Sequence, residues 1–249
     1  MFNLSNDFIY GSIGGFCGVI ISHPFDTIKT RIQSNTATTI LQAIKMKQLY
    51  SGITPPLFGI MLEKSIVFGF YNESKKIGLN NFWSGIIGGF MSTLIVTPVD
   101  RLKIHYQNNK LNLEKIRFNN LYKGFIPTIF RETPGFGIYF STYNYLTTKY
   151  NPEKNSIFKT FIAGSLSGFV SWIFIYPSDL IKTIYQSNNK SNMGLFDVIK
   201  YIANDNNEKF LIAKCIKNFY RGFPLAIMRA MPLHGGVFMG YEFAKKLNN

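Results

Sequence analysis

Pro-Phe-Asp-Thr-Ile-Lys at residues 24–29 is the first of three nearly equivalent hexapeptides, followed by Pro-Val-Asp-Arg-Leu-Lys at 98–103 and Pro-Ser-Asp-Leu-Ile-Lys at 177–182. A glutamine follows each copy at the same distance: Gln33, Gln107 and Gln186. The prolines lie 74 and 79 residues apart. A motif that recurs at a near-constant period identifies repeated copies of one structural unit.

Three such units account for nearly all of the 249 residues. One unit is too short to bury much apolar surface alone, so the three are expected to pack as one domain over 1–249. We place the repeats at 6–78, 80–150 and 155–249. Each hexapeptide closes an apolar run, and a second apolar run follows it within the same repeat.

The sequence predicts six hydrophobic helices, two in each repeat, at 8–34, 53–76, 82–108, 125–149, 157–187 and 223–247. Glycine, proline, serine and threonine interrupt them, and a membrane accepts such interruption where the backbone faces protein or a water-filled cavity. Small residues four apart recur in the first helix of each repeat and allow close helix approach: Gly11/Gly15, Gly14/Gly18, Gly85/Gly89 and Gly164/Gly168. We therefore expect an all-α membrane protein whose six transmembrane helices form three pseudo-symmetric pairs around a central cavity.

Composition and charge argue against other classes of function. The net charge is +14, but the cations are spread over the segments between apolar runs, which is typical of loops at a membrane surface rather than of a nucleic-acid site. No cluster of histidine, cysteine and carboxylate predicts a metal, and no nucleophile with a neighbouring base predicts an enzyme. We expect no cofactor. A soluble helical-repeat scaffold is the alternative from a different class.

The Pro-x-Asp-x-x-Lys pattern predicts a ring of ion pairs. A proline inside a helix removes a backbone hydrogen bond and kinks the helix, so three kinked helices can converge at one end. Aspartate and lysine three residues apart share a helix face. In a threefold bundle each aspartate can meet the lysine of the next repeat, which gives three pairs: Asp26 with Lys103, Asp100 with Lys182, and Asp179 with Lys29. Charge-assisted bonds in such a constriction suit a gate.

These repeated motifs resemble the mitochondrial carrier family over almost the whole chain. The resemblance implies a monomeric, multi-pass solute carrier of the mitochondrial inner membrane that works by alternating access. It implies that the aspartate–lysine ring closes the matrix side and that Gln33, Gln107 and Gln186 brace it. It also implies that lipid, notably cardiolipin, binds near the glycines that open the second helix of each repeat: Gly52, Gly124 and Gly222.

A second gate on the cytoplasmic side, marked by aromatic-acid-x-x-base on the second helix of each repeat, is also implied by the family. Only Tyr241-Glu242-Phe-Ala-Lys245 is complete. The first repeat has Asn72 in place of the acid but keeps Lys75, and the second has lost both charges. We expect one ion pair between repeats, Glu242 with Lys75, and hence a weaker cytoplasmic gate.

Symmetry also predicts a substrate site. Residues at equal distances after the three opening glycines should lie at equal depth, and seven residues on are Gly59, Arg131 and Arg229. Charged side chains at membrane depth face water or a ligand, and Glu63 and Glu132 lie close to this level. An arginine can hold an α-carboxylate in a fork, Glu63 a distant ammonium, and Glu132 the α-amino group. Alternatively, Arg131 pairs with a neighbouring glutamate and only shapes the cavity.

The segments around Glu63, Arg131-Glu132 and Arg229 look like those of ornithine and other basic amino acid carriers, and Trp172 fits that branch. The resemblance implies exchange of ornithine-, lysine- or arginine-like substrates. Carnitine/acylcarnitine carriers share the arginine–acid pair and remain the alternative, together with nucleotide carriers. Trp172 is interpreted equally well as core packing.

Overall fold

The computed structural model describes residues 4–33, 42, 44, 48–107, 122, 125–150, 156–187, 195–203, 218–220 and 222–248. The described residues contain helices joined by turns, and no strand. The helices are α1 (Leu4–Gln33), α3 (Thr54–Lys76), α4 (Asn81–Gln107), α6 (Phe125–Tyr150), α7 (Ile157–Ser187), α8 (Leu195–Ala203) and α10 (Phe223–Leu247). Several predicted positions lie outside the described part of the chain: Gly124, and the side chains of Gln33, Asp100, Lys103, Gln107 and Gln186.

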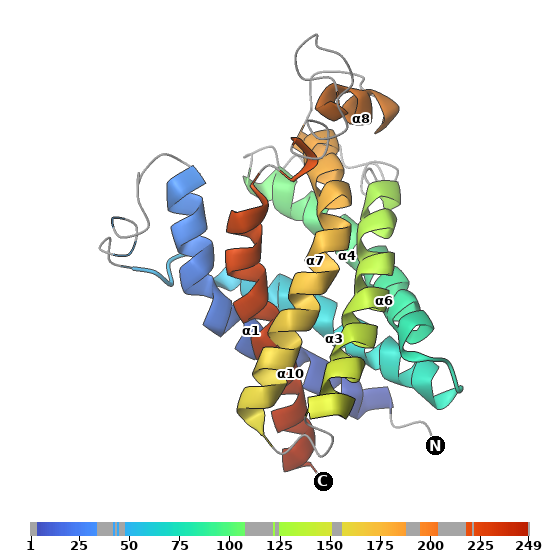
Figure 1. Ribbon diagram of the computed structural model, residues 1–249. Coiled ribbons are helices and arrows are strands. Elements are labelled where there is room, and N and C mark those ends of the chain that lie inside the picture. The colour runs from blue at the N-terminus through green and yellow to red at the C-terminus, as the bar shows by residue number, and fades with distance from the viewer. Residues whose placement is uncertain are drawn as a thin grey trace.

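Six long helices form a closed ring (Figure 1). Each contacts the next along the chain, and α10 returns to contact α1. Both chain termini lie at one end of the bundle, and the short α8 lies at the other (Figure 1). The all-helical prediction is confirmed. The predicted boundaries agree closely, except that α1 begins at Leu4 rather than at residue 8.

Glycines allow neighbouring helices to approach at backbone distance, as their spacing predicts. A Cβ on Gly15 of α1 would lie 2.8 Å from the Cα of Met61 in α3. A Cβ on Gly164 of α7 would lie 2.8 Å from the carbonyl oxygen of His234 in α10. Any larger residue would push these helices apart, so the pattern of small residues allows the short distances between neighbouring helices of the ring.

Only the first helix of each repeat has the length and apolar composition of a membrane span among the described residues. The three spans are Asn6–Lys29, Asn81–Val99 and Ile157–Lys182, with mean hydropathies of 1.3, 1.5 and 1.4. The partner helices α3, α6 and α10 carry the charged side chains that face the interior, which lowers their hydropathy. Large apolar side chains such as Phe130 and Phe174 are 67% and 64% exposed on the outside, as a lipid-facing surface requires.

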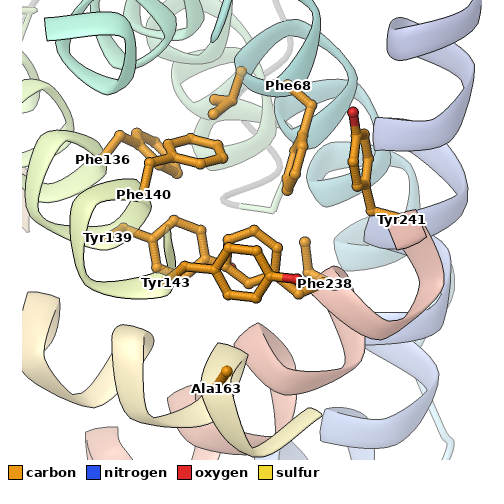
Figure 2. Packing of buried hydrophobic residues seen from close by; sticks show 10 residues of the cluster. Phe68, Phe136, Tyr139, Phe140, Tyr143, Ala163, Phe238 and Tyr241 are labelled. Atoms are coloured by element: carbon orange, nitrogen blue, oxygen red, sulfur yellow. The ribbon is translucent and has the colours of Figure 1, made fainter. Parts of the chain in front are cut away.

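An aromatic cluster fills the centre of the bundle between α3, α6 and α10 (Figure 2). Phe68, Phe140 and Phe238 come from these three helices and are each 1% exposed. They lie sixteen residues after Gly52, Gly124 and Gly222, respectively, so the three repeats contribute one ring each at the same level. The bundle is therefore packed shut at this level, and the interior cavity lies on one side of the cluster.

Candidate functional site

A cavity of about 210 Å³ lies inside the bundle. Five charged side chains line it, and all of them come from the second helices of the repeats: Glu63, Lys64, Arg131, Glu132 and Arg229. Four of these are predicted substrate residues, and the structure brings them together in one cavity. Their spacing along α3, α6 and α10 turns each one toward the bundle interior.

Ion pairs join all five charges to one another or to the predicted matrix gate. Nη1 of Arg131 lies 2.7 Å from Oε1 of Glu132. Nε of the same arginine lies 2.9 Å from Oδ1 of Asp179, an ion pair without hydrogen-bond geometry. Nε of Arg229 lies 3.3 Å from Oδ1 of Asp26. Arg131 thus does pair with its neighbouring glutamate, the alternative that the sequence leaves open.

These contacts follow the threefold pattern of the chain. Arg131 on α6 reaches the gate aspartate of α7, and Arg229 on α10 reaches the gate aspartate of α1. The equivalent position in the first repeat is Gly59, which carries no side chain and is absent from the cavity lining; its neighbour Ile60 lines the cavity instead. Two of the three gate carboxylates therefore contact an arginine of the cavity.

Trp172 packs in the core and also lines the cavity, and its contact with substrate stays a prediction. Its side chain is 5% exposed, and its Nε1 donates a hydrogen bond to Nε2 of His234 at 3.2 Å. The guanidinium carbon of Arg229 lies 5.8 Å from the indole ring centroid, within cation–π range. Trp172 thus supports the arginine from one side.

The predicted matrix gate can be followed at only one of its pairs, Asp179 with Lys29, because the side chains of Asp100 and Lys103 are not described. Nε of Arg131 lies 2.9 Å from Oδ1 of Asp179, and the pairing of Asp179 with Lys29 stays a prediction. Lys182 is 5% exposed and lies within the bundle. The ring, and the bracing by glutamines, stay predictions.

The predicted cytoplasmic gate is built from stacked aromatic rings. Each tyrosine of the motif lies flat against the phenylalanine of the next repeat. The ring centroids are 3.9 Å apart for Tyr71 and Phe140, 3.3 Å for Tyr143 and Phe238, and 4.3 Å for Tyr241 and Phe68. The three contacts link the three repeats in a cycle, and we call these six residues the aromatic gate. All of them except Tyr71 are labelled in Figure 2.

Hydrogen bonds from tyrosine and asparagine side chains accompany the aromatic gate. Nδ2 of Asn72 donates to the hydroxyl oxygen of Tyr241 at 2.7 Å, and that hydroxyl donates to Oδ1 of Asp7 at 3.0 Å. The hydroxyl of Tyr143 donates to Oε1 of Glu242 at 3.3 Å. These contacts join α1, α3, α6 and α10 without requiring a second charged partner.

The expected ion pair between Lys75 and Glu242 is not among those found in the described part of the chain. Lys75, Glu242 and Lys245 line a second cavity of about 340 Å³ on the far side of the aromatic gate. The phenylalanines of the gate are absent from the predicted site, although their equal offset from the opening glycines is a signal that could have identified them.

Two of the glycines predicted to bind lipid have a backbone role. Gly52 and Gly222 have φ values of +76° and +86°, in the left-handed region that favours glycine. Gly222 is the N-cap of α10, and Gly52 precedes α3. Their recurrence is therefore explained by the turn that starts each helix, and lipid binding at these points remains a proposal.

Comparison with known proteins agrees with the fold. A family model described as mitochondrial carrier protein matches three successive segments, residues 2–81, 78–154 and 153–249. Similar curated proteins include the mitochondrial glycine transporter YMC1 of Saccharomyces cerevisiae, 29% identical over 97% of this chain and 91% of the relative. The mitochondrial basic amino acids transporter of Rattus norvegicus is 30% identical over 93% and 86%, respectively. The mitochondrial carnitine/acylcarnitine carrier protein of Mus musculus is 25% identical over 96% and 93%.

The three matched segments together cover the chain from residue 2 to residue 249. Family members are multi-pass solute transporters of the mitochondrial inner membrane rather than enzymes. The repeats, the ring of six long helices and the interior cavity are the features of such a transporter. The chain belongs to the mitochondrial carrier family.

Proposed function

We propose that this carrier exchanges amino acids, with ornithine, lysine and arginine as its first substrates. The observation that carries the proposal is the cavity in which Arg131 and Arg229 lie with Glu63 and Glu132. Guanidinium groups bind a carboxylate through two parallel N–H donors. The carboxylates supply partners for the α-amino group and for a cation at the end of the substrate side chain.

The size of the cavity favours a small metabolite. Its volume of about 210 Å³ is below the range of roughly 300–1,000 Å³ that accommodates drug-sized ligands. An amino acid needs less room than a nucleotide or a long acyl ester. Size and charge together therefore support an amino acid over the nucleotide alternative.

Substrate binding and gating share the same charged groups. Arg131 and Arg229 contact the gate residues Asp179 and Asp26 at 2.9 and 3.3 Å. A substrate carboxylate that binds these arginines competes with the aspartates for them. Binding then changes the charge balance at the matrix gate, which couples occupancy of the cavity to the position of the gate.

A neutral zwitterion such as glycine or carnitine is the second candidate. The specific observation in its favour is that Glu63 already has an internal partner, because Nζ of Lys64 lies 2.6 Å from its Oε1. A substrate without a side-chain cation leaves this pair intact. Glycine and carnitine carriers are also among the similar proteins.

We further propose that the carrier works as a monomer, with anionic lipid such as cardiolipin at the N-termini of α3 and α10. The partial positive charge of a helix N-terminus favours an anionic head group. Gly52 and Gly222 are exposed where these helices begin.

Replacing Glu63 by glutamine tests the proposal, measured as exchange of radiolabelled lysine by the purified carrier in liposomes. Loss of a carboxylate that pairs with a buried ammonium costs about 2–5 kcal/mol, so lysine exchange should fall at least about 30-fold. The matched control is Glu73→Gln, on the same helix but paired with Lys76 outside the cavity, and it should keep the wild-type rate. Undiminished lysine exchange by Glu63→Gln would contradict the assignment.

A further inference from the structure

Lys64 is a buried cation that has no role in the substrate contacts proposed above. Its side chain is only 4% exposed. Its ammonium group lies 2.6 Å from Oε1 of Glu63 and 4.5 Å from the ring centroid of Phe136. Burial of an ammonium at membrane depth is costly unless it is paired, so its position depends on the glutamate beside it and on the face of the aromatic ring.

The position of Lys64 in the repeat places it at the boundary between the cavity and the aromatic gate. It lies twelve residues after Gly52, and the equivalent residues of the other repeats are Phe136 and His234. All three line the cavity. Phe136 and His234 have an aromatic ring at this position, whereas the first repeat has a flexible cation. Lys64 therefore breaks the threefold pattern of the cavity at this level.

The charges around the cavity make Lys64 a competitor of a cationic substrate. Three cations and two carboxylates line the cavity, and its two arginines also contact the gate aspartates Asp179 and Asp26. Glu132 already has Arg131 as its partner. A substrate ammonium that approaches Glu63 therefore finds the carboxylate occupied by a tethered ammonium of the same chemistry.

We propose that Lys64 is a specificity-determining residue that lowers the preference of this carrier for basic over neutral amino acids. The side-chain cation of a basic substrate must displace Lys64 from Glu63, whereas a neutral amino acid binds without disturbing the pair. The displaced ammonium keeps a favourable position over the face of Phe136, so displacement is feasible without exposing the lysine to the membrane. This inference rests on the proposed function, amino acid exchange.

The experiment compares wild type with Lys64→Gln in liposomes, with radiolabelled lysine and radiolabelled glycine as separate substrates. We expect the ratio of kcat/KM for lysine to that for glycine to rise about 10-fold, chiefly through a lower KM for lysine. Lys76→Gln is the matched control, because this lysine also pairs with a glutamate of α3 but lies outside the cavity. Its ratio should stay at the wild-type value.

Three results would overturn the inference. The first is an unchanged ratio in Lys64→Gln, and the second is a fall in lysine exchange alone, which would mean that Lys64 only keeps Glu63 ionised. The third is a wild-type protein that exchanges neither amino acid, which rejects the proposed function itself. If Lys64→Gln does not yield folded protein, Lys64→Met preserves the apolar stem, and the same rise in the ratio is expected.

Discussion

Replacing Arg229 by alanine is expected to lower amino acid exchange in liposomes by about 30-fold or more. Arg229 lines the cavity, contacts Asp26 and lies against Trp172. Truncation removes the proposed partner of the substrate carboxylate and also leaves a gate aspartate without this contact. Loss of one member of a buried charge pair costs about 2–5 kcal/mol, which corresponds to about 30- to 5,000-fold.

Two further variants separate the geometry of Arg229 from its charge. Arg229→Lys keeps the charge but cannot form a two-point fork, so its exchange rate should lie between those of wild type and the alanine variant. Lys246→Ala removes an exposed cation from the last turn of the same helix and should leave exchange unchanged. Exchange at the wild-type rate by Arg229→Ala would remove this residue from the site.

Replacing Phe238 by alanine is expected to open the cavity to the cytoplasmic side. The Phe238 ring stacks on Tyr143 at 3.3 Å and contacts Phe68 at 5.5 Å in the aromatic gate. Removal of a buried phenylalanine side chain costs about 3–5 kcal/mol. A change of that size in the closed state alone shifts a two-state equilibrium more than about 100-fold toward the open state.

Cysteine labelling measures this shift. Val96 lines the cavity, so Val96→Cys in a background without Cys17 and Cys215 provides the reporter. A membrane-impermeant maleimide added from the cytoplasmic side should label the reporter much faster in Phe238→Ala than in the Phe238 parent. Phe243→Ala, on the same helix but 49% exposed, is the matched control and should not change labelling. Equal labelling of all three proteins would show that the aromatic gate does not close the carrier.

The fold could be predicted from sequence because its signals repeat. Three copies of the proline–aspartate–lysine motif at a near-constant period identified the repeats, and the apolar runs around them identified the six long helices. The start of α1 was placed four residues late because polar residues such as Asn6 and Asp7 precede its apolar part. The tight glycine contacts were likewise predictable, since small residues recur at the same spacing in each repeat.

The candidate site was only partly predictable, because partner choice depends on side chains from different helices. Equal offsets placed Arg131 and Arg229 at one depth, and the structure brings both to one cavity. No sequence pattern showed that these arginines would contact Asp179 and Asp26. Those contacts depend on where neighbouring helices place their side chains.

The packing of the aromatic gate could not be predicted from the charges of its motif either. The charges that remain in the motif of the second helices favour an ion pair of Lys75 with Glu242. In the structure, packing between rings such as Tyr71 and Phe140 holds the same helices together. The second helices therefore pack against one another even though their motif has lost several of its charged residues. Whether this gate is weaker than a gate with three ion pairs stays a prediction.

The most direct test of amino acid exchange at the charged cavity is counter-exchange by the purified wild-type carrier in liposomes. Uptake of radiolabelled ornithine, lysine and arginine is compared between liposomes loaded with the same amino acids, with nucleotides or with carnitine. The account predicts saturable uptake that requires an amino acid inside. Uptake driven only by internal nucleotide or carnitine, with no amino acid exchange, would contradict the proposed role of the Glu63, Arg131, Glu132 and Arg229 cavity.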